Sequence, residues 1–265
     1  MASEKILIAL TPSESKRLIA KGVTNLEEVQ RALKHGTIII TLGTTNAYVA
    51  EEILNALPGS EMEIDRSRYA AGVITSDGTC VVPKAYRVSD VLIKDGKISD
   101  DGIEKAIEEL SSEDVFIKGA NALDATNTAG ILLAHPAGGT IGAALGIVMA
   151  QGVNFIIPVG IEKTIPYSIT EAGKRVGKGR FYKSVGKSVG LMPVHGKVIT
   201  EVEALKILGA DAAFPIGAGG VNGGEGSVVI CAECSSTAKM DELMGVITQI
   251  KGEAGVTVVG TDCVE

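Results

Sequence analysis

The amino-acid sequence predicts an α/β protein, with a mostly parallel sheet covered by helices on both faces and then a ferredoxin-like α+β domain. Two observations lead to this fold class. Over roughly the first 160 residues, β-branched or apolar runs alternate with segments of helical periodicity, which is typical of a parallel sheet. The rest of the chain follows the order β-α-β-β-α-β of the ferredoxin-like unit. We therefore expect an α/β ligand-binding domain over 1–190 and a ferredoxin-like domain over 191–265.

The first segments indicate two helices, a strand and a third helix. The sequence 11–14 (TPSE) is a capping box with proline at the first helical position, and it begins a helix that ends near Gly22. The sequence 24–27 (TNLE) repeats the box and begins a second helix. The run 37–43 (TIIITLG) is β-branched and apolar, so we expect a buried strand there. The helix that follows this strand ends at Pro58.

The middle segments indicate hairpins, helices and strands. Asp77-Gly78 and Asp95-Gly96 lie between apolar runs and predict two β-hairpins with type I′ turns. Ser99 is expected to cap a helix whose apolar residues share one face. An Ala/Gly-rich helix is expected at 140–150, between strands at 114–117 and 153–159.

The last segments supply the second domain. We expect a strand, a helix that begins with a capping box, two strands around a loop, a helix and a final strand, at 194–199, 200–209, 211–216, 227–231, 240–250 and 256–259. The loop 217–226 (GAGGVNGGEG) is rich in glycine, which permits close approach of the backbone to a ligand or to the other domain. A mobile hairpin loop is the alternative.

The composition excludes two classes of partner. The chain has 265 residues and a formal net charge of −7, whereas a general nucleic-acid binder is usually basic. Aromatic residues make up 3% and tryptophan is absent, which disfavours base-stacking platforms. Polar residues and a proline interrupt the apolar stretch 140–161, so we expect a buried helix and strand there instead of a membrane span. We expect a cytoplasmic homo-oligomer that binds neither nucleic acid nor a membrane.

The four cysteines do not suggest a disulfide framework. Cys231 and Cys234 have the spacing of a redox pair or of half a zinc site, and chance spacing is the third interpretation. Cys80 and Cys263 are isolated in the sequence, and no histidine is near them. We therefore expect no metal and no cofactor.

Two strand-to-helix turns are candidate anion sites. A helix N-terminus offers free N–H groups and a partial positive charge, and glycine lets a ligand approach the backbone. The first turn consists of Gly43, Thr44, Thr45 and Asn46, and the second of Gly138, Gly139 and Thr140. The alternative for the first turn is a tight turn in which Thr44 only caps the helix.

The segment 118–140 starts where an expected strand ends, which is where ligands bind in open α/β sheets. Within it, Asp124 is a candidate general base and His135 a candidate general acid or base. The alternatives are a turn-capping aspartate and an ordinary loop histidine.

The stretch 173–187 concentrates basic side chains without an acidic one. It could close over a phosphorylated ligand, with lysine as a point charge and arginine as a bidentate donor. Lys178 and Arg180 are the ligand-binding candidates, and a solvated flexible loop is the alternative.

Three segments in order resemble one enzyme superfamily. The segment 38–57 (IIITLGTTNAYVAEEILNAL) is similar to the strand, turn and helix at the start of ribose-5-phosphate isomerase A, and 114–124 (DVFIKGANALD) is similar to its segment around Gly-Ala-Asp-Glu-x-Asp. The Gly-Thr helix start and the strand up to Lys163 resemble the methylthioribose-1-phosphate isomerase branch. The superfamily includes sugar-phosphate isomerases, glucosamine-6-phosphate deaminase and coenzyme A transferases.

The sequence departs from this family at its acid–base residues. Asn121 and Ala122 stand where the family segment has carboxylates, so that only Asp124 retains an acid, and the family's later catalytic glutamate is missing. The resemblance therefore implies the fold and the ligand class, with Asn121 and Lys163 among the ligand-binding residues. It implies a protein that binds a small phosphorylated metabolite at the carboxyl ends of the strands, and an isomerase if it is an enzyme. A coenzyme A transferase-like enzyme and a non-catalytic metabolite sensor remain as alternatives.

Overall fold

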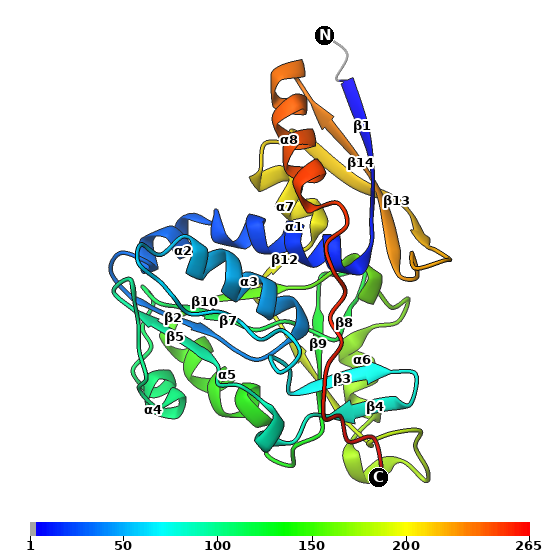
Figure 1. Ribbon diagram of the computed structural model, residues 1–265. Coiled ribbons are helices and arrows are strands. Elements are labelled where there is room, and N and C mark those ends of the chain that lie inside the picture. The colour runs from blue at the N-terminus through cyan, green and yellow to red at the C-terminus, as the bar shows by residue number, and fades with distance from the viewer. Residues whose placement is uncertain (1–3) are drawn as a thin grey trace.

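A six-stranded sheet forms the centre of the computed structural model, which describes residues 4–265 (Figure 1). Its strands, in spatial order, are β12 (Lys197–Ile199), β10 (Asn154–Pro158), β7 (Val115–Ile117), β2 (Thr37–Ile40), β5 (Val91–Lys94) and β6 (Lys97–Ile98). The first four are parallel, and the hairpin β5–β6 adds two antiparallel strands. The expectation of a mostly parallel sheet is thus met in part, because the sheet is mixed.

Helices cover both faces of the central sheet. In β2, Ile38 and Ile40 face one core and Ile39 faces the other, as the alternation of side chains along a strand requires. The first core includes α1 (Pro12–Thr24), α2 (Glu27–Ala32) and α3 (Thr44–Asn55). The second core includes α4 (Ile103–Glu108) and α5 (Gly139–Gln151).

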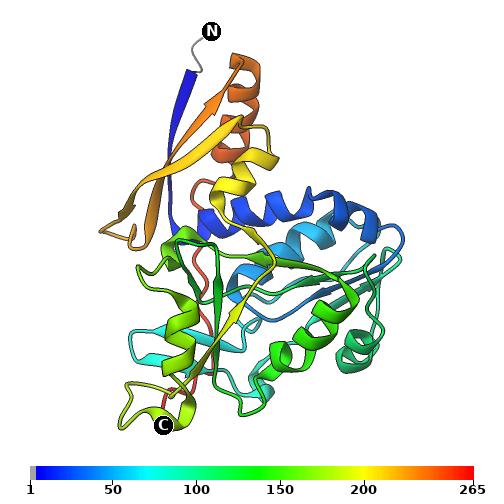
Figure 2. The same cartoon turned by 180° about the vertical axis from the view of Figure 1, so that it is seen from behind.

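A smaller antiparallel sheet stands apart from the central one, and α1 lies between the two in both views (Figure 1 and Figure 2). It has the order β1 (Glu4–Leu10), β14 (Ser227–Cys234), β13 (Ala212–Gly219), and α7 (Glu201–Ile207) and α8 (Thr237–Ile250) pack with it. At Gly22 of α1, a Cβ would lie 2.7 Å from the Cβ of Ala204 in α7, so the glycine permits this close helix packing.

The four-stranded ferredoxin-like sheet is not confirmed. The expected strand 194–199 is divided between β11 (Gly190–Val194) and β12, which belong to two different sheets, and residues 256–259 form no strand. Instead β1 pairs with β14 and completes a three-stranded sheet. The two expected domains thus exchange strands. β1, which precedes residue 190, lies in the smaller antiparallel sheet, and β12, which follows residue 190, lies in the central sheet.

Two further small sheets and a few short helices complete the fold. One sheet has the order β11, β9 (Ala129–Leu133), β8 (Ala122–Leu123), and the other pairs β3 (Gly72–Thr75) with β4 (Gly78–Val81). The remaining elements are α6 (Ile169–Arg175), η1 (Lys84–Tyr86), η2 (Ile161–Lys163) and η3 (Lys178–Arg180). No helix in the described part of the chain is long and apolar enough to cross a lipid bilayer.

The local turn and cap signals are confirmed in some places and wrong in others. The capping boxes at Thr11 and Thr200 are present. The box at Thr24 is wrong, because its hydroxyl donates to Ala20 O within α1, and Ser99 does not cap α4 because Gly102 takes that place. Both hairpins are confirmed. Only the Asp95-Gly96 turn has the two positive φ values of type I′, 48° and 73°.

Residues 251–265 form an extended strap that runs from the end of α8 along the molecule to the region of β4 (Figure 1). A disulfide between Cys80 and Cys263 fastens its far end, which the linear spacing of the cysteines did not predict. Cys231 and Cys234 are both free thiols on β14. Because they are three residues apart on one strand, they face opposite sides of the sheet, which favours chance spacing over a redox pair.

Candidate functional site

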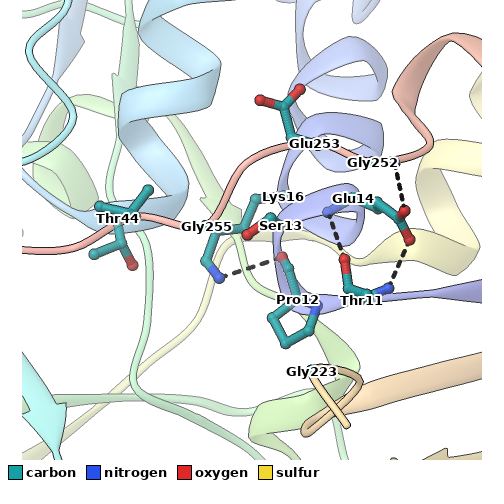
Figure 3. Close-up of a pocket in the computed structure, with 11 residues that line it drawn as sticks. Thr11, Pro12, Ser13, Glu14, Lys16, Thr44, Gly223, Gly252, Glu253 and Gly255 are labelled. Carbon is teal, nitrogen blue, oxygen red and sulfur yellow. Dashed lines mark hydrogen bonds between the residues drawn. The ribbon is translucent and has the colours of Figure 1, made fainter.

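A pocket of about 400 Å³ lies where the start of α1, the start of α3, the β13–β14 loop and the strap meet (Figure 3). Its lining residues are Thr11, Pro12, Ser13, Glu14, Lys16, Thr44, Gly223, Gly252, Glu253, Gly255 and Val256. Since α3 begins directly after β2, the pocket lies at the carboxyl edge of the central sheet. This is the edge at which ligands bind in open α/β sheets.

The start of α3, whose first residue Thr44 lines this pocket, has free backbone N–H groups. Gly43 takes the N-cap position without a side-chain cap, and its own N–H donates to Tyr69 O at 3.0 Å. The next N–H groups of the helix, those of residues 44–46, donate to no acceptor within residues 4–265, whereas the N–H of Ala47 reaches Gly43 O. These free N–H groups and the helix dipole make the turn electropositive.

The start of α1 adds a second helix N-terminus and a lysine. Proline at position 12 has no N–H, and Thr11 caps Glu14, so the first turn is well ordered. Lys16 is half-buried, and its Nζ donates to Pro12 O at 3.2 Å (Figure 3). Burial lowers the pKa of Lys16 below its ordinary value, and the Glu162 carboxylate opposes this shift. No ion pair occupies the Lys16 ammonium among the described residues.

The two acidic side chains that line the pocket are already neutralised by cations. Glu14 is buried and accepts from Lys251 Nζ and from the N–H of Gly252, both at 2.8 Å. Burial acts to raise the pKa of Glu14, but these bonds outweigh it and lower the pKa. Glu253 accepts from Arg17 at 2.9 Å and from Arg66 at 2.7 Å. The pocket therefore keeps the start of α3 and Lys16 as positive groups without a paired carboxylate within residues 4–265.

The same contacts hold the strap in place. The guanidinium groups of Arg17 and Arg66 lie 4.9 and 4.4 Å from the centre of the Tyr48 ring. The Tyr48 hydroxyl donates to Ala254 O at 3.0 Å. Two cations and one aromatic ring from the first part of the chain thus fix the strap as a wall of the pocket.

Behind Lys16, two glutamates follow the carboxyl ends of neighbouring parallel strands. Glu162 lies in η2 after β10, and Glu201 begins α7 after β12. Glu201 is fully buried, and its Oε2 accepts from the N–H of Ile161 at 2.9 Å. Within the described residues, its Oε1 and the buried Oε2 of Glu162 have no hydrogen-bond partner. Neither residue carries a motif that marks it as functional in the sequence. The usable signal was their place directly after expected strands.

The first predicted turn lies at this site. Thr44 lines the pocket, and Thr45 and Asn46 are buried beside it. Asn46 Nδ2 donates to Thr41 O at 2.7 Å, which ties the turn to the end of β2. The oxygens Thr45 Oγ1 and Asn46 Oδ1 have no partner among residues 4–265.

The second predicted turn is not brought to this pocket. Gly138, Gly139 and Thr140 begin α5, which packs on the opposite face of the central sheet, and none of them lines the pocket. The helix start that shares the pocket with α3 is that of α1. His135 is exposed, and its Nδ1 accepts from the N–H of Ala137 at 3.2 Å.

The Asp124 carboxylate accepts hydrogen bonds that hold the surrounding backbone in place. Its Oδ1 accepts from the N–H and hydroxyl of Thr126 and from the N–H of Thr128, and its Oδ2 accepts from the N–H of Ile169 at 2.9 Å. Burial acts to raise the pKa of Asp124, but these bonds lower it to about 2. Such a carboxylate is a poor base, so the prediction of a general base here finds no support. Asn121 is likewise used structurally, since its Oδ1 accepts from Leu132 N.

The candidate basic side chains also donate hydrogen bonds to backbone carbonyl groups of the protein. Lys163 donates to Ala120 O at 3.0 Å, Lys178 to Ala134 O at 3.2 Å and Arg180 to Lys174 O at 2.7 Å. None of the residues 173–187 lines the pocket.

The glycine-rich loop 217–226 does reach the pocket, through Gly223. Gly226 has a φ of +80°, and a Cβ there would lie 3.0 Å from Pro12 Cγ, so this loop needs glycine where it meets α1.

No cluster of three or more His, Cys, Asp or Glu in the described chain could hold a metal ion. A comparison of the chain with protein-family models, with curated proteins and with solved structures finds no match.

Proposed function

We propose that the protein binds a small phosphorylated metabolite in this pocket, with the phosphate at the start of α3. The observation that carries the proposal is the set of free N–H groups at residues 44–46, beside the unpaired ammonium of Lys16. Phosphate groups bind to helix N-termini because N–H donors and the helix dipole act together. The start of α1 in the same pocket adds a second such terminus.

Size and charge support the same class of ligand. The volume of about 400 Å³ falls within the roughly 300–1,000 Å³ that is usual for small-molecule sites. Because Glu14 and Glu253 are paired with Lys251, Arg17 and Arg66, they do not repel an anion as free carboxylates would. The resemblance of 38–57 and 114–124 to ribose-5-phosphate isomerase A supports a sugar phosphate. Since Asp124 is a poor base, the proposal is one of binding, and isomerisation is a separate question for assay.

Thr44→Pro tests the proposal with a small change to the fold. Thr44 is the first residue of α3, where proline fits the helix and removes one N–H, and the ψ of 146° at Gly43 suits a following proline. We expect the affinity for ribose 5-phosphate to fall about tenfold or more, since a hydrogen bond to a charged group contributes about 1.5–3 kcal/mol. Isothermal titration calorimetry measures this change, with unphosphorylated ribose as the ligand control.

A matched control variant is Thr237→Pro. Thr237 is the first residue of α8, it is exposed, and the ψ of 146° at Ser236 again suits a following proline. It does not line the pocket. Equal affinity of the two proline variants for ribose 5-phosphate, or equal affinity of the native protein for ribose and ribose 5-phosphate, would contradict the proposal.

A further inference from the structure

Glu162 and Glu201 are neighbours through one short segment. A Cβ on Gly160 would lie 1.7 Å from Glu162 Oε2, so this carboxylate folds back over Gly160. The Glu201 carboxylate accepts from the N–H of the next residue, Ile161, at 2.9 Å. Both side chains thus reach the same short segment at the end of β10, where β12 runs beside it.

This carboxylate pair has no direct ion pair within residues 4–265. The groups that face it are Lys16 and Ser15 from α1, and Lys163 from η2 lies near Lys16. Both lysine ammonium groups donate to backbone carbonyls, Lys16 to Pro12 and Lys163 to Ala120. Two adjacent carboxylates, one of them fully buried, repel each other when both are ionised, and a proton on the buried one removes that repulsion.

The unpartnered oxygens fit a proton on Glu201. A buried carboxylate oxygen without a donor is costly, and Glu201 Oε1 and Glu162 Oε2 are both in this state. A proton on Glu201 adds an O–H donor to this group of acceptors. In agreement with this, burial and the neighbouring Glu162 carboxylate raise the pKa of Glu201 to about 7.

We infer that the buried Glu201 carboxyl holds a proton beside Glu162 and that anion binding in the pocket is coupled to the uptake of this proton. The coupling rests on the proposed function, and Lys16 connects the two sites because it lines the pocket and also faces the pair. A bound anion disfavours the doubly ionised pair by charge repulsion, so it binds with uptake of a proton from solvent. By linkage, a proton on the pair strengthens anion binding to the same extent.

The proton on the pair is tested in the ligand-free protein. With glutamate labelled by ¹³C at the side-chain carboxyl, one resonance is expected to titrate near neutral pH, well above the usual glutamate range. Glu201→Gln removes this resonance, and Glu162→Gln, a change at a half-buried site, moves its midpoint to lower pH. Glu203→Gln is the control, because glutamine also serves at this position of a capping box. Titration of all glutamates below about pH 5 would overturn the proton on Glu201.

The coupling is tested with sulfate, a dianion that does not itself titrate near pH 7. Calorimetry in two buffers with different heats of ionisation is expected to show uptake of roughly half a proton per sulfate at pH 7 if binding raises the pKa of the pair by about one unit. Sulfate affinity is then expected to fall up to about tenfold from pH 6 to pH 9. Both effects should vanish in Glu201→Gln and in Glu162→Gln and persist in Glu203→Gln.

The outcomes separate the inference from the proposed function. Sulfate binding without buffer dependence overturns the coupling and leaves the proposed function intact. Failure of sulfate and ribose 5-phosphate to bind overturns the proposed function and the coupling together. The titration by nuclear magnetic resonance still decides whether Glu201 holds a proton near neutral pH.

Discussion

Arg17→Met should loosen the strap and lower the stability of the whole protein. The side chain is 10% exposed and forms three ion pairs, with N–O distances of 2.6, 3.0 and 2.9 Å to Glu51, Glu52 and Glu253. Breaking a buried ion pair from one side costs about 3–5 kcal/mol, because the partner is left buried and unpaired. Here the three carboxylates are 16–18% exposed and Arg66 still pairs with two of them, so we expect about 2–3 kcal/mol. Methionine keeps most of the apolar stem.

Lys21→Met is the matched control for this change. Lys21 lies one helical turn further along α1 and pairs only with Glu52, at 3.4 Å, with 25% of its side chain exposed. Its loss should cost less than about 1 kcal/mol. Urea unfolding followed by circular dichroism measures both variants, and hydrogen exchange of residues 251–256 reports the strap. Equal losses in the two variants, or unchanged exchange of the strap in Arg17→Met, would refute the assignment of Arg17 as its anchor.

Two further predictions concern Asp124 and the disulfide. Asp124→Asn should lower Tm at pH 7. The difference in Tm from the native protein should shrink as pH falls from about 4 through about 2, because the lowered pKa of about 2 contributes stability only while the carboxylate is ionised. A difference in Tm that grows at low pH in calorimetry would contradict this. Cys263→Ser should speed amide exchange near residues 259–265 and in β4, while residues 252–254 stay protected by Arg17, Arg66 and Tyr48. Equally faster amide exchange along the whole strap would show that the disulfide alone holds it.

The parts of the site that could be predicted are those with local signals. The β-branched run before Gly43 and the polar turn after it place the start of α3 at a strand end, and this position lines the pocket. The box at Thr11 likewise predicts the start of α1, because the capping residues and the proline are adjacent in sequence. Local sequence does not tell which helix starts share a pocket. For that reason the turns before α3 and α5 were both candidate anion sites, although only the first lies at the pocket.

The parts that could not be predicted depend on pairing between distant segments. β1 is a short strand whose partner, β14, follows more than 200 residues later, and no local signal gives that pairing. The Glu162–Glu201 pair exists only because β10 and β12 are neighbours. The sequence predicts a single strand where the structure has β11 and β12 as two separate strands. Gly196 divides these two strands, at a point where a Cβ would lie 2.6 Å from Phe155 O.

The strand exchange between the two sheets has a consequence for synthesis on the ribosome. β1 emerges early. Its apolar residues, which alternate between buried and exposed positions in the folded protein, remain without a partner strand until β14 has been made. During that interval the nascent chain exposes an open strand edge, which is prone to pair with other chains. The pocket is completed later still, since residues 252–256 must reach helix starts that left the ribosome at residues 11–16 and 44. Ligand binding should therefore be one of the last properties that a growing chain acquires, and chaperone protection of β1 should matter most before that stage.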